Sequence, residues 1–361
     1  MRYPRIVMRW VSLLRSFATI SAAWCLVGCG DAGPPAPALC SAVPDRLQLG
    51  SVSSGCGTVA TDTTLAARDG AVYFVSKSGL CASDASGTYL LAAADGADRG
   101  VVAGPWLAAD GVLDLDRETG ALHRTPFAGG ERTVVADFHP VLVGSIIYTA
   151  AYDGRYVYVP DQVTLVETAL WRVEPGGTPE QIGTVTGHPD GDRVGGIVPT
   201  ESHVDTVLDV EGALHRLELA DGSDRALFAS PTHWLNLLGG DGDVAYVNDE
   251  LPSFSYRERA LARIDGSGNA TGAFGPAAPP RSAAAAVQVT ADQVFAGVGL
   301  SYAEGAFLGV VTLPRTGIGG DLVFCMPDAD ERPREAVRAI AVDGDTVFAS
   351  VAPASIVRFH R

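Results

Sequence analysis

Positive charge is scarce in this sequence, and lysine is almost missing. The 361 residues include 26 Lys and Arg against 42 Asp and Glu, and Lys77 is the only lysine. Residues 1–28 hold four of the arginines and no acid, so the remainder has 22 basic and 42 acidic residues, a net charge of −20. A surface of this sign repels nucleic acid and anionic lipid headgroups. We therefore expect no nucleic-acid partner.

The local motifs of common enzyme classes are also missing. The sequence has no Gly-x-Ser-x-Gly turn, His-Glu-x-x-His helix, Walker loop or dinucleotide-binding glycine pattern. Asp114, Asp116 and Glu118 imitate the start of a calcium loop. However, Gly120 comes one place late and Thr125 stands where the closing glutamate belongs, so we interpret the segment as a turn between strands. The sequence predicts no catalytic residue, no metal site and no cofactor.

No apolar run is long enough to form a transmembrane helix. Residues 17–27 are apolar, but the run is too short to span a bilayer, and it follows an arginine-rich start that is typical of a signal peptide. It ends in Leu26-Val27-Gly28-Cys29, which resembles the lipobox of bacterial lipoproteins. The resemblance implies that residues 1–28 are removed and that Cys29 carries a lipid, the only expected attachment to a membrane.

A short tether is expected after this cysteine. Residues 29–44 are rich in Pro, Gly and Ala, which stiffen the backbone and offer nothing to bury. Lipoproteins that stay at the inner membrane tend to have aspartate after the lipidated cysteine, whereas this chain has Gly30, which favours the outer membrane. The expected organisation is a signal peptide (1–28), a lipidated cysteine with its tether (29–44) and one domain (45–361) displayed in the cell envelope.

From residue 60 onward, short β-rich runs alternate with Asp-Gly and Gly-Gly turns, as in antiparallel sheets. One unit recurs seven times, at roughly 46 residues per copy. Each copy has a valine in its second strand and leucine or isoleucine in its third, and five copies add an arginine two places later. The valines are Val72, Val112, Val157, Val207, Val244, Val294 and Val347; the third-strand residues are Leu80, Leu122, Leu170, Leu214, Leu261, Leu308 and Ile356; the arginines are Arg124, Arg172, Arg216, Arg263 and Arg358.

A period of this length, made of four short strands, is typical of a propeller blade. We therefore predict an all-β, seven-bladed β-propeller, with six or eight blades as alternatives. The seventh copy lacks an outer strand, and the segment Arg46–Val52 is expected to supply it and close the ring. The pattern loosely resembles YWTD-type propellers and the Asp-Gly repeat propellers of bacterial lipoproteins. The Tyr-Trp-Thr-Asp motif itself is not repeated, so no ligand-binding role is carried over.

Two disulfides are expected in the exported chain. Four cysteines follow Cys29, and an even number in an oxidising compartment favours two bridges, for which three connectivities are possible. Cys56 approaches the first blade from its outer edge, and Cys81 lies in the third strand of that blade. Cys40 precedes the closing strand, and Cys325 ends the outer strand of the sixth blade. We therefore expect the pairs Cys56–Cys81 and Cys40–Cys325.

The longer connections of the repeat should gather on one face. Antiparallel blades place the first-to-second and third-to-fourth strand turns on one face, and these turns are mostly tight. The opposite face then carries the longer second-to-third strand loops, around 161–167, 248–258 and 297–304, and the links between blades. Long loops on a rigid scaffold often carry function. The candidate binding residues there are the aromatic and charged side chains that make interface anchors: His139, His188, His233, Trp234, Phe254, Tyr256, Arg257 and Tyr302.

Two functions stay open. The first is a non-catalytic binding or scaffolding lipoprotein whose partner is a protein, peptide or glycan. The alternative is a metal-dependent propeller hydrolase or lactonase, which needs ligands that converge on the central channel from several inner strands; Glu201, Asp205 and Asn236 lie near such strands. The inner strands are otherwise apolar, which favours the first function. His123 and His215 occupy equivalent third-strand positions, which predicts packing rather than metal binding.

Overall fold

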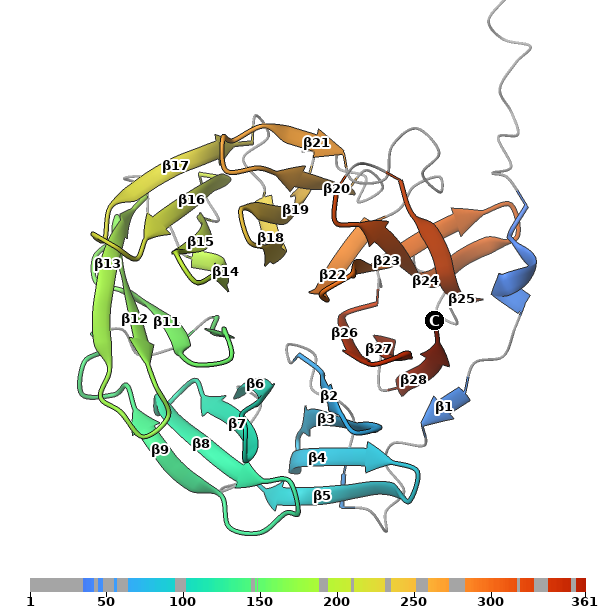
Figure 1. The fold of residues 1–361 in the computed structure, drawn as a ribbon, viewed down its shortest axis with the longest axis horizontal. Coiled ribbons are helices and arrows are strands. Elements are labelled where there is room, and N and C mark those ends of the chain that lie inside the picture. Colours follow the sequence, from blue (N-terminus) through green and yellow to red (C-terminus); the bar gives the residue numbers. More distant parts are fainter. Residues whose placement is uncertain are drawn as a thin grey trace, which may run out of the picture.

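Seven four-stranded antiparallel sheets form a ring around an open centre (Figure 1). The computed structural model describes residues 35–41, 45–47, 55–56, 64–94, 102–143, 147, 149–187, 194–208, 211–230, 235–250, 259–272, 283–316, 319–327, 337–351 and 355–361. Each sheet is a blade, and its first strand lies nearest the axis. The predicted seven-bladed β-propeller is therefore confirmed, and the alternatives of six or eight blades are wrong.

The first four blades follow the chain order without exception. Blade 1 contains β2 (Ala66–Arg68), β3 (Ala71–Ser76), β4 (Gly79–Asp84) and β5 (Gly87–Ala93); blade 2 contains β6 (Val102–Leu107), β7 (Gly111–Asp116), β8 (Ala121–Pro126) and β9 (Thr133–Asp137); blade 3 contains β10 (Ala151–Tyr152), β11 (Val157–Gln162), β12 (Glu167–Val173) and β13 (Glu180–Thr186); blade 4 contains β14 (Val194–Pro199), β15 (His203–Leu208), β16 (Ala213–Glu218) and β17 (Asp224–Ala229).

The last blade takes its outer strand from the other end of the chain. Blade 5 contains β18 (Leu235–Asp241), β19 (Val244–Glu250), β20 (Arg259–Ile264) and β21 (Ala270–Gly272); blade 6 contains β22 (Ala283–Val289), β23 (Gln293–Tyr302), β24 (Gly305–Pro314) and β25 (Asp321–Pro327); blade 7 contains β26 (Ala339–Asp343), β27 (Thr346–Val351), β28 (Ser355–His360) and β1 (Asp45–Leu47).

Strand β1 closes the ring at the predicted place, with the bounds Asp45–Leu47; residues 48–52 of the predicted segment lie outside the described residues. The strand pairs antiparallel with β28, and Arg46 lies opposite Val357. The short 3-10 helix η1 (Ala38–Ser41), just before it in sequence, contacts β25 of blade 6. The N-terminal segment therefore touches the last two blades and covers the edge that β28 would otherwise expose.

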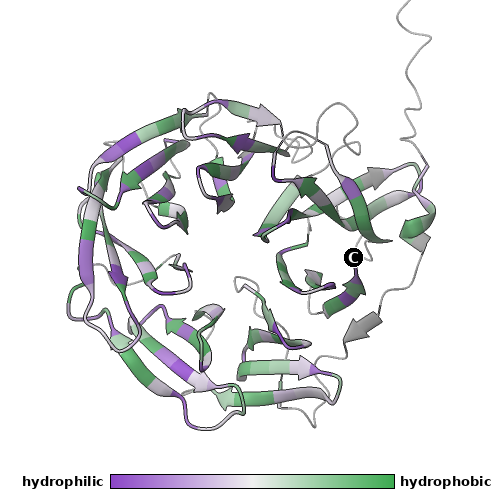
Figure 2. Ribbon diagram, viewed as in Figure 1, coloured by the Kyte–Doolittle hydropathy of each residue, from purple (hydrophilic) through white to green (hydrophobic). Residues whose placement is uncertain are grey.

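The hydrophobic core is divided among the junctions between blades. The buried apolar residues fall into clusters that each combine side chains from two neighbouring blades, including the junction of blade 7 with blade 1, where Phe348 packs in the same cluster as Phe74. Figure 2 shows hydrophobic residues along the strands of the blades. Because a blade has no apolar centre of its own, each one is stable only against its neighbours.

A β-bulge recurs between the third and fourth strands. The register shifts directly after Leu80, Leu122, Leu170, Leu214 and Val310, in blades 1, 2, 3, 4 and 6. This repeated feature fixes the structural alignment of the blades, because a bulge increases the local twist and marks one position in the strand. The third-strand residue of blade 6 is therefore Val310, two places after the predicted Leu308.

The two faces of the ring differ in the connections that they carry. The tight-turn face carries the first-to-second strand turns 69–70, 108–110, 153–156, 200–202, 242–243, 290–292 and 344–345, together with the third-to-fourth strand turns. The long-loop face carries the second-to-third strand turns, of which 77–78, 117–120, 163–166 and 303–304 are described, and the links between blades. In the part of the chain that the structure describes, no helix is long and apolar enough to cross a bilayer.

The loop expected at residues 297–304 is largely strand. β23 and β24 are ten residues long each and are separated only by a turn at 303–304. Gly297 within β23 allows close packing of the neighbouring blade: a Cβ on Gly297 would lie 2.6 Å from the carbonyl oxygen of Val337 in the link to blade 7. Similarly, the predicted loop at 161–167 shortens to the turn 163–166 because β11 runs to Gln162.

Candidate functional site

Both predicted disulfides are present. Cys40 is bonded to Cys325, which joins η1 to β25, and Cys56 is bonded to Cys81, which joins the segment before blade 1 to β4. All four side chains are buried. Two buried bridges indicate that the protein folds in an oxidising compartment outside the cytoplasm.

The best-buried ion pair lies in blade 4. The guanidinium of Arg216 on β16 donates two hydrogen bonds to the Asp205 carboxylate on β15, at 2.8 and 2.9 Å, and both side chains are at most 3% exposed. The same guanidinium forms an ion pair with Asp243 in the β18–β19 turn of blade 5. The pKa of Arg216 is raised because hydrogen bonds and charge from Asp205 and Asp243 outweigh the effect of burial, which acts in the opposite direction.

Further polar contacts join neighbouring blades on the tight-turn face. Arg315 of blade 6 donates to Asp241 of blade 5, with Nε–Oδ2 at 2.5 Å. Arg361, after β28, donates to Asp292 of blade 6 at 3.1 Å. The backbone N–H of Gly70 in blade 1 donates to Asp343 of blade 7 at 2.6 Å. These contacts hold the turns of adjacent blades in fixed positions.

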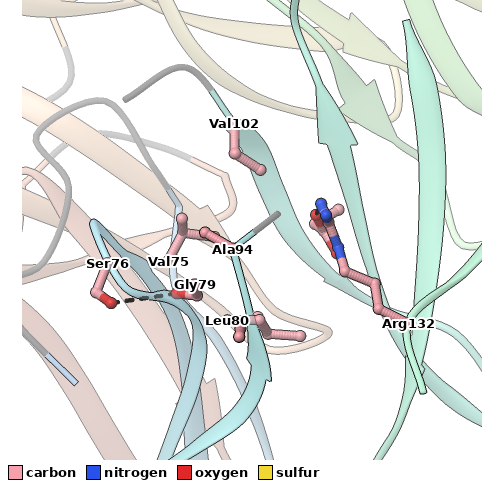
Figure 3. Close-up of a pocket in the computed structure, with 9 residues that line it drawn as sticks. Val75, Ser76, Gly79, Leu80, Ala94, Val102 and Arg132 are labelled. Atoms are coloured by element: carbon pink, nitrogen blue, oxygen red, sulfur yellow. Dashed lines mark hydrogen bonds and ion pairs between the residues drawn. The ribbon is translucent and has the colours of Figure 1, made fainter. Parts of the chain in front are cut away.

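A small cavity lies between blades 1 and 2 (Figure 3). It encloses about 20 Å³, room for one water molecule. Its lining includes Ser76, whose hydroxyl donates to the carbonyl of Gly79 at 3.2 Å, and Arg132, which forms an ion pair with Asp114. Because Asp114 already binds Arg132 and is 2% exposed, this cavity is part of the blade junction and not a substrate site.

The segment that imitates a calcium loop is the turn between β7 and β8. Asp116 accepts hydrogen bonds from the backbone N–H groups of Glu118 and Thr119, at 2.9 and 3.1 Å. Gly120 has a φ of 73°, and its N–H donates to the carbonyl of Asp116. The interpretation as a strand-to-strand turn is confirmed. Among the described residues, no group of three or more His, Cys, Asp or Glu is arranged to hold a metal ion.

The central channel contains a larger cavity of about 550 Å³. The inner strands of the seven blades all contribute to its wall. The wall is mainly aliphatic, and its polar side-chain atoms come from four residues; the lining residues are Thr64, Leu65, Ala66, Ala67, Pro105, Trp106, Leu107, Ala150, Ala151, Tyr152, Ile197, Val198, Pro199, Leu238, Val287, Gln288, Ala341 and Val342. Polar atoms, backbone groups included, nevertheless supply as much of the exposed wall as apolar atoms do, and the described lining contains no His, Cys, Asp or Glu. The wall therefore suits a small organic ligand better than a metal ion.

The possible ligands of a metal in the channel, Glu201, Asp205 and Asn236, do not converge on this wall. Asp205 is bound to Arg216, and neither Glu201 nor Asn236 belongs to the described lining. His123 and His215 are buried on β8 and β16, each directly after the repeated bulge, which supports the predicted packing role. The Nδ1 of His215 also lies 3.0 Å from the Asp224 carboxylate.

Only two of the eight candidate binding residues lie in the described part of the chain. His139 is exposed and follows β9 in the link to blade 3. Tyr302, at the end of β23, is 9% exposed and packs edge-on against Phe307 at a centroid distance of 5.5 Å. The other six lie outside the described residues: His188, His233, Trp234, Phe254, Tyr256 and Arg257.

The structure adds an exposed apolar group that sequence reasoning missed. Val143 is 72% exposed, Val163 42% and Leu165 68%. All three lie on the long-loop face, and the N–H of Val143 donates to Asp161 at 2.7 Å, which joins the two segments that carry them. The signal in the sequence was the run of apolar residues 163, 165 and 166 inside a turn, where polar residues are usual.

Comparisons with known proteins agree with the fold and go no further. No family model and no curated protein matches the sequence. A catalytically inactive virginiamycin B lyase from Staphylococcus aureus, solved with quinupristin, is similar with a TM-score of 0.59 and 13% identity, covering 88% of this chain and 99% of the lyase. The structure of U3-55K is similar with a TM-score of 0.57 and 12% identity, covering 88% of this chain and 100% of that chain. The RRP9 WD40 repeats are similar with a TM-score of 0.55 and 12% identity, covering 91% of this chain and 98% of that chain.

The fold class follows from these observations. The chain forms a seven-bladed β-propeller, and structures with this similarity include an enzyme as well as WD40 repeats. At such low sequence identity the likeness extends to the fold alone, because propellers support unrelated functions on one scaffold.

Proposed function

We propose that this protein is an exported, lipid-anchored binding or scaffolding protein that holds a protein, peptide or glycan partner on its long-loop face. The observation that carries the proposal is the exposed apolar group of Val143, Val163 and Leu165 on that face. Apolar side chains grouped on a surface mark sites of protein–protein or ligand contact. The exposed His139 precedes Val143 in the same link and adds a polar neighbour in sequence.

The contacts on the tight-turn face make it less suited to binding a partner than the long-loop face. Its arginines bind carboxylates within a blade or across to the next one, as Arg216, Arg315 and Arg361 do. Side chains held in such pairs lose their hydrogen bonds if they turn toward a partner, so binding there has a cost that the long-loop face avoids.

Site-specific photo-crosslinking tests which face is used. A photoreactive amino acid replaces Leu165 on the long-loop face or, as a control, Asp110 on the tight-turn face, whose side chain is 62% exposed. We expect envelope preparations to give a defined adduct from position 165 and none from position 110. Adducts from position 110 alone would mean that the faces are assigned the wrong way round.

The candidate residues outside the described ranges are tested by substitution. Alanine at Trp234, Tyr256 and Arg257 together should abolish the adduct at position 165, since aromatic and arginine side chains contribute most to interface energies. The melting temperature should fall by no more than a few degrees. An adduct that persists at full yield would remove these residues from the proposed interface.

The anchor is tested separately. Labelled palmitate should enter the wild-type protein and not a Cys29→Ala variant, and the variant should move from the membrane to the soluble envelope fraction. Equal labelling of both proteins would overturn lipidation at Cys29 while leaving the binding proposal intact.

A further inference from the structure

The channel cavity has the size of a small-molecule site, and it lies toward one end of the ring. Its volume of about 550 Å³ falls within the range of ligand pockets. Several lining residues belong to the later part of the inner strands: Leu107 ends β6, Tyr152 ends β10 and Pro199 ends β14. Thr64 and Leu65, which precede β2, and Leu238, the middle residue of β18, extend the lining further along the channel. Because each inner strand runs toward its first-to-second strand turn, the cavity lies mainly in the half of the channel nearest the tight-turn face.

The wall offers an aromatic surface beside aliphatic ones. Trp106 of blade 2 and Tyr152 of blade 3 have ring centroids 6.4 Å apart and an interplanar angle of 42°. Both rings line the cavity and are only partly buried. Rings of this kind bind apolar groups and attract cations to their faces.

The mouth of the cavity is acidic. Each of the seven first-to-second strand connections contains or adjoins a carboxylate, within a few residues of the channel wall: Asp69, Asp110, Asp153, Glu201, Asp243, Asp292 and Asp345. Five of these acids are ion-paired with arginine: Asp69 with Arg68, Asp110 with Arg124, Asp243 with Arg216, and Asp292 and Asp345 with Arg361. Asp153 instead accepts hydrogen bonds from the Tyr158 hydroxyl and from backbone N–H groups, which do not neutralise its charge. Glu201 is exposed.

The negative field reaches the wall itself. Burial raises the pKa of Tyr152, and the charges of Asp153 and Asp110 raise that pKa further. The Tyr152 hydroxyl donates to the carbonyl of Gly154 at 2.7 Å, in the turn that contains Asp153, so a positive charge on a ligand at this end of the ring would be stabilised by the Asp153 carboxylate.

We propose that the channel binds a small organic cation with an apolar body, such as an alkyl- or arylammonium compound, which enters from the tight-turn face. The apolar body lies against Trp106, Tyr152 and the aliphatic wall, and the positive charge stays at the acidic mouth. This site is separate from the proposed long-loop interface and does not depend on it.

Calorimetric titration with three probes of equal chain length tests the proposal: octyltrimethylammonium, octanol and octanoate. The cation should bind roughly tenfold more tightly than the neutral probe, because attraction to aromatic faces and partly screened carboxylates adds to the shared apolar contact. Its affinity should fall as salt is added. Octanoate should bind most weakly. Equal affinity for all three probes, or no measurable binding of the cation, would overturn the proposal.

Matched variants locate the charge. Asp153→Asn with Glu201→Gln removes two charges at the mouth that the arginine ion pairs described above do not include, whereas Glu118→Gln with Glu131→Gln removes two exposed charges away from the channel. The mouth variant should bind the cation roughly threefold more weakly and octanol unchanged, while the control retains both affinities. A loss of affinity that is equal in the two variants would show that net charge, and not the mouth, attracts the cation.

Substitutions of the two aromatic residues test the role of the channel wall. Trp106→Ala should weaken the binding of all three probes. Tyr152→Leu, which replaces the aromatic ring with an aliphatic side chain, should weaken the binding of the cation more than that of octanol. The second variant keeps the test valid if the first fails to fold. Unchanged binding in a folded Tyr152→Leu variant would place the ligand outside the channel.

Discussion

The two halves of the ring are held together by different kinds of bond. On the tight-turn face, ion pairs such as Arg216–Asp243 and Arg361–Asp292 cross from one blade to the next. Toward the long-loop face, two disulfides attach N-terminal segments to the ring: Cys81 is near the start of β4 and Cys325 near the end of β25, which are the ends of those strands that adjoin the long-loop face. A hydrogen bond from Asn248 of blade 5 to the carbonyl of Ala284 in blade 6, at 2.8 Å, also joins blades there. Short turns of two to four residues place a charged residue at a similar position in each blade, whereas the longer connections on the opposite face do not.

The difference gives the long-loop half more freedom to vary. A disulfide needs only two positions, so the segments around it can change in length and sequence without loss of the cross-link. The ion pairs need a defined turn geometry in both blades, and the Asp69–Gly70 turn shows it, with φ of 54° at Asp69 and 78° at Gly70.

Removing the Cys40–Cys325 bridge should have the largest effect on stability. The bridge spans 285 residues, so replacing both cysteines with alanine should lower the free energy of unfolding by about 5 kcal/mol on chain-entropy grounds. Removing Cys56–Cys81, which spans 25 residues, should cost about 3 kcal/mol. Urea unfolding of the two variants measures both values, and a reversed order would contradict the covalent role assigned to the longer bridge.

Breaking the buried pair in blade 4 should come next. Arg216→Met leaves the Asp205 carboxylate buried without its charged partner, which should destabilise the protein by about 3–5 kcal/mol. The double variant Arg216→Met with Asp205→Leu should recover much of the loss, because neither charge is then buried alone. If the single and double variants unfold at the same urea concentration, the loss comes from packing and not from the unpaired carboxylate.

Alkaline pH should weaken the blades through their buried tyrosines. Burial, and then the hydrogen bond to Asp153, raise the pKa of Tyr158, and burial raises that of Tyr246. An unfolded tyrosine loses its proton near pH 10, so stability should be complete below about pH 10 and fall as the pH rises further. Urea midpoints at pH 8 and pH 10.5 measure the fall. The fall in urea midpoint should be smaller in a Tyr158→Phe variant than in the wild type. An equal fall in the two proteins would assign the pH dependence to other ionisable groups.

An exposed ion pair on the tight-turn face should contribute least to stability. Arg124 and Asp110 lie 2.8 Å apart, with side chains 38% and 62% exposed. Arg124→Gln should therefore change the free energy of unfolding by less than about 1 kcal/mol, since solvent screens the interaction. A loss comparable to that of Arg216→Met, measured in the same urea titration, would mean that the tight-turn face acts as one coupled network.

The repeat pattern in the sequence predicted the blades more reliably than the register within them. Val207 and Val244 were aligned with the second-strand valines, but the positions equivalent to Val72 are Val204 and Ala245, which pack toward the preceding blade as Val72 does. Val207 lies an odd number of residues from Val204, so its side chain points to the other side of the sheet. Blade 4 is rich in valine, and counting valines could not distinguish the two sides.

The candidate site was predictable in part. The long-loop face and the two disulfides followed from antiparallel topology and cysteine placement. The exposure of Val143, Val163 and Leu165 did not, because an apolar residue near a strand end is equally suited to burial. Tyr302 shows the reverse case, since an aromatic residue expected on the surface fills the junction beside Phe307.

The sequence was enough to predict the number of blades, the strand that closes the ring and the pairing of the cysteines, because these depend on a repeat period and on order along the chain. The folded structure was needed to show which arginine reaches the next blade, as Arg216 reaches Asp243, and that the inner strands of the seven blades enclose a cavity. Those features depend on the angle and distance between blades, which side-chain packing at the junctions sets and no local pattern encodes.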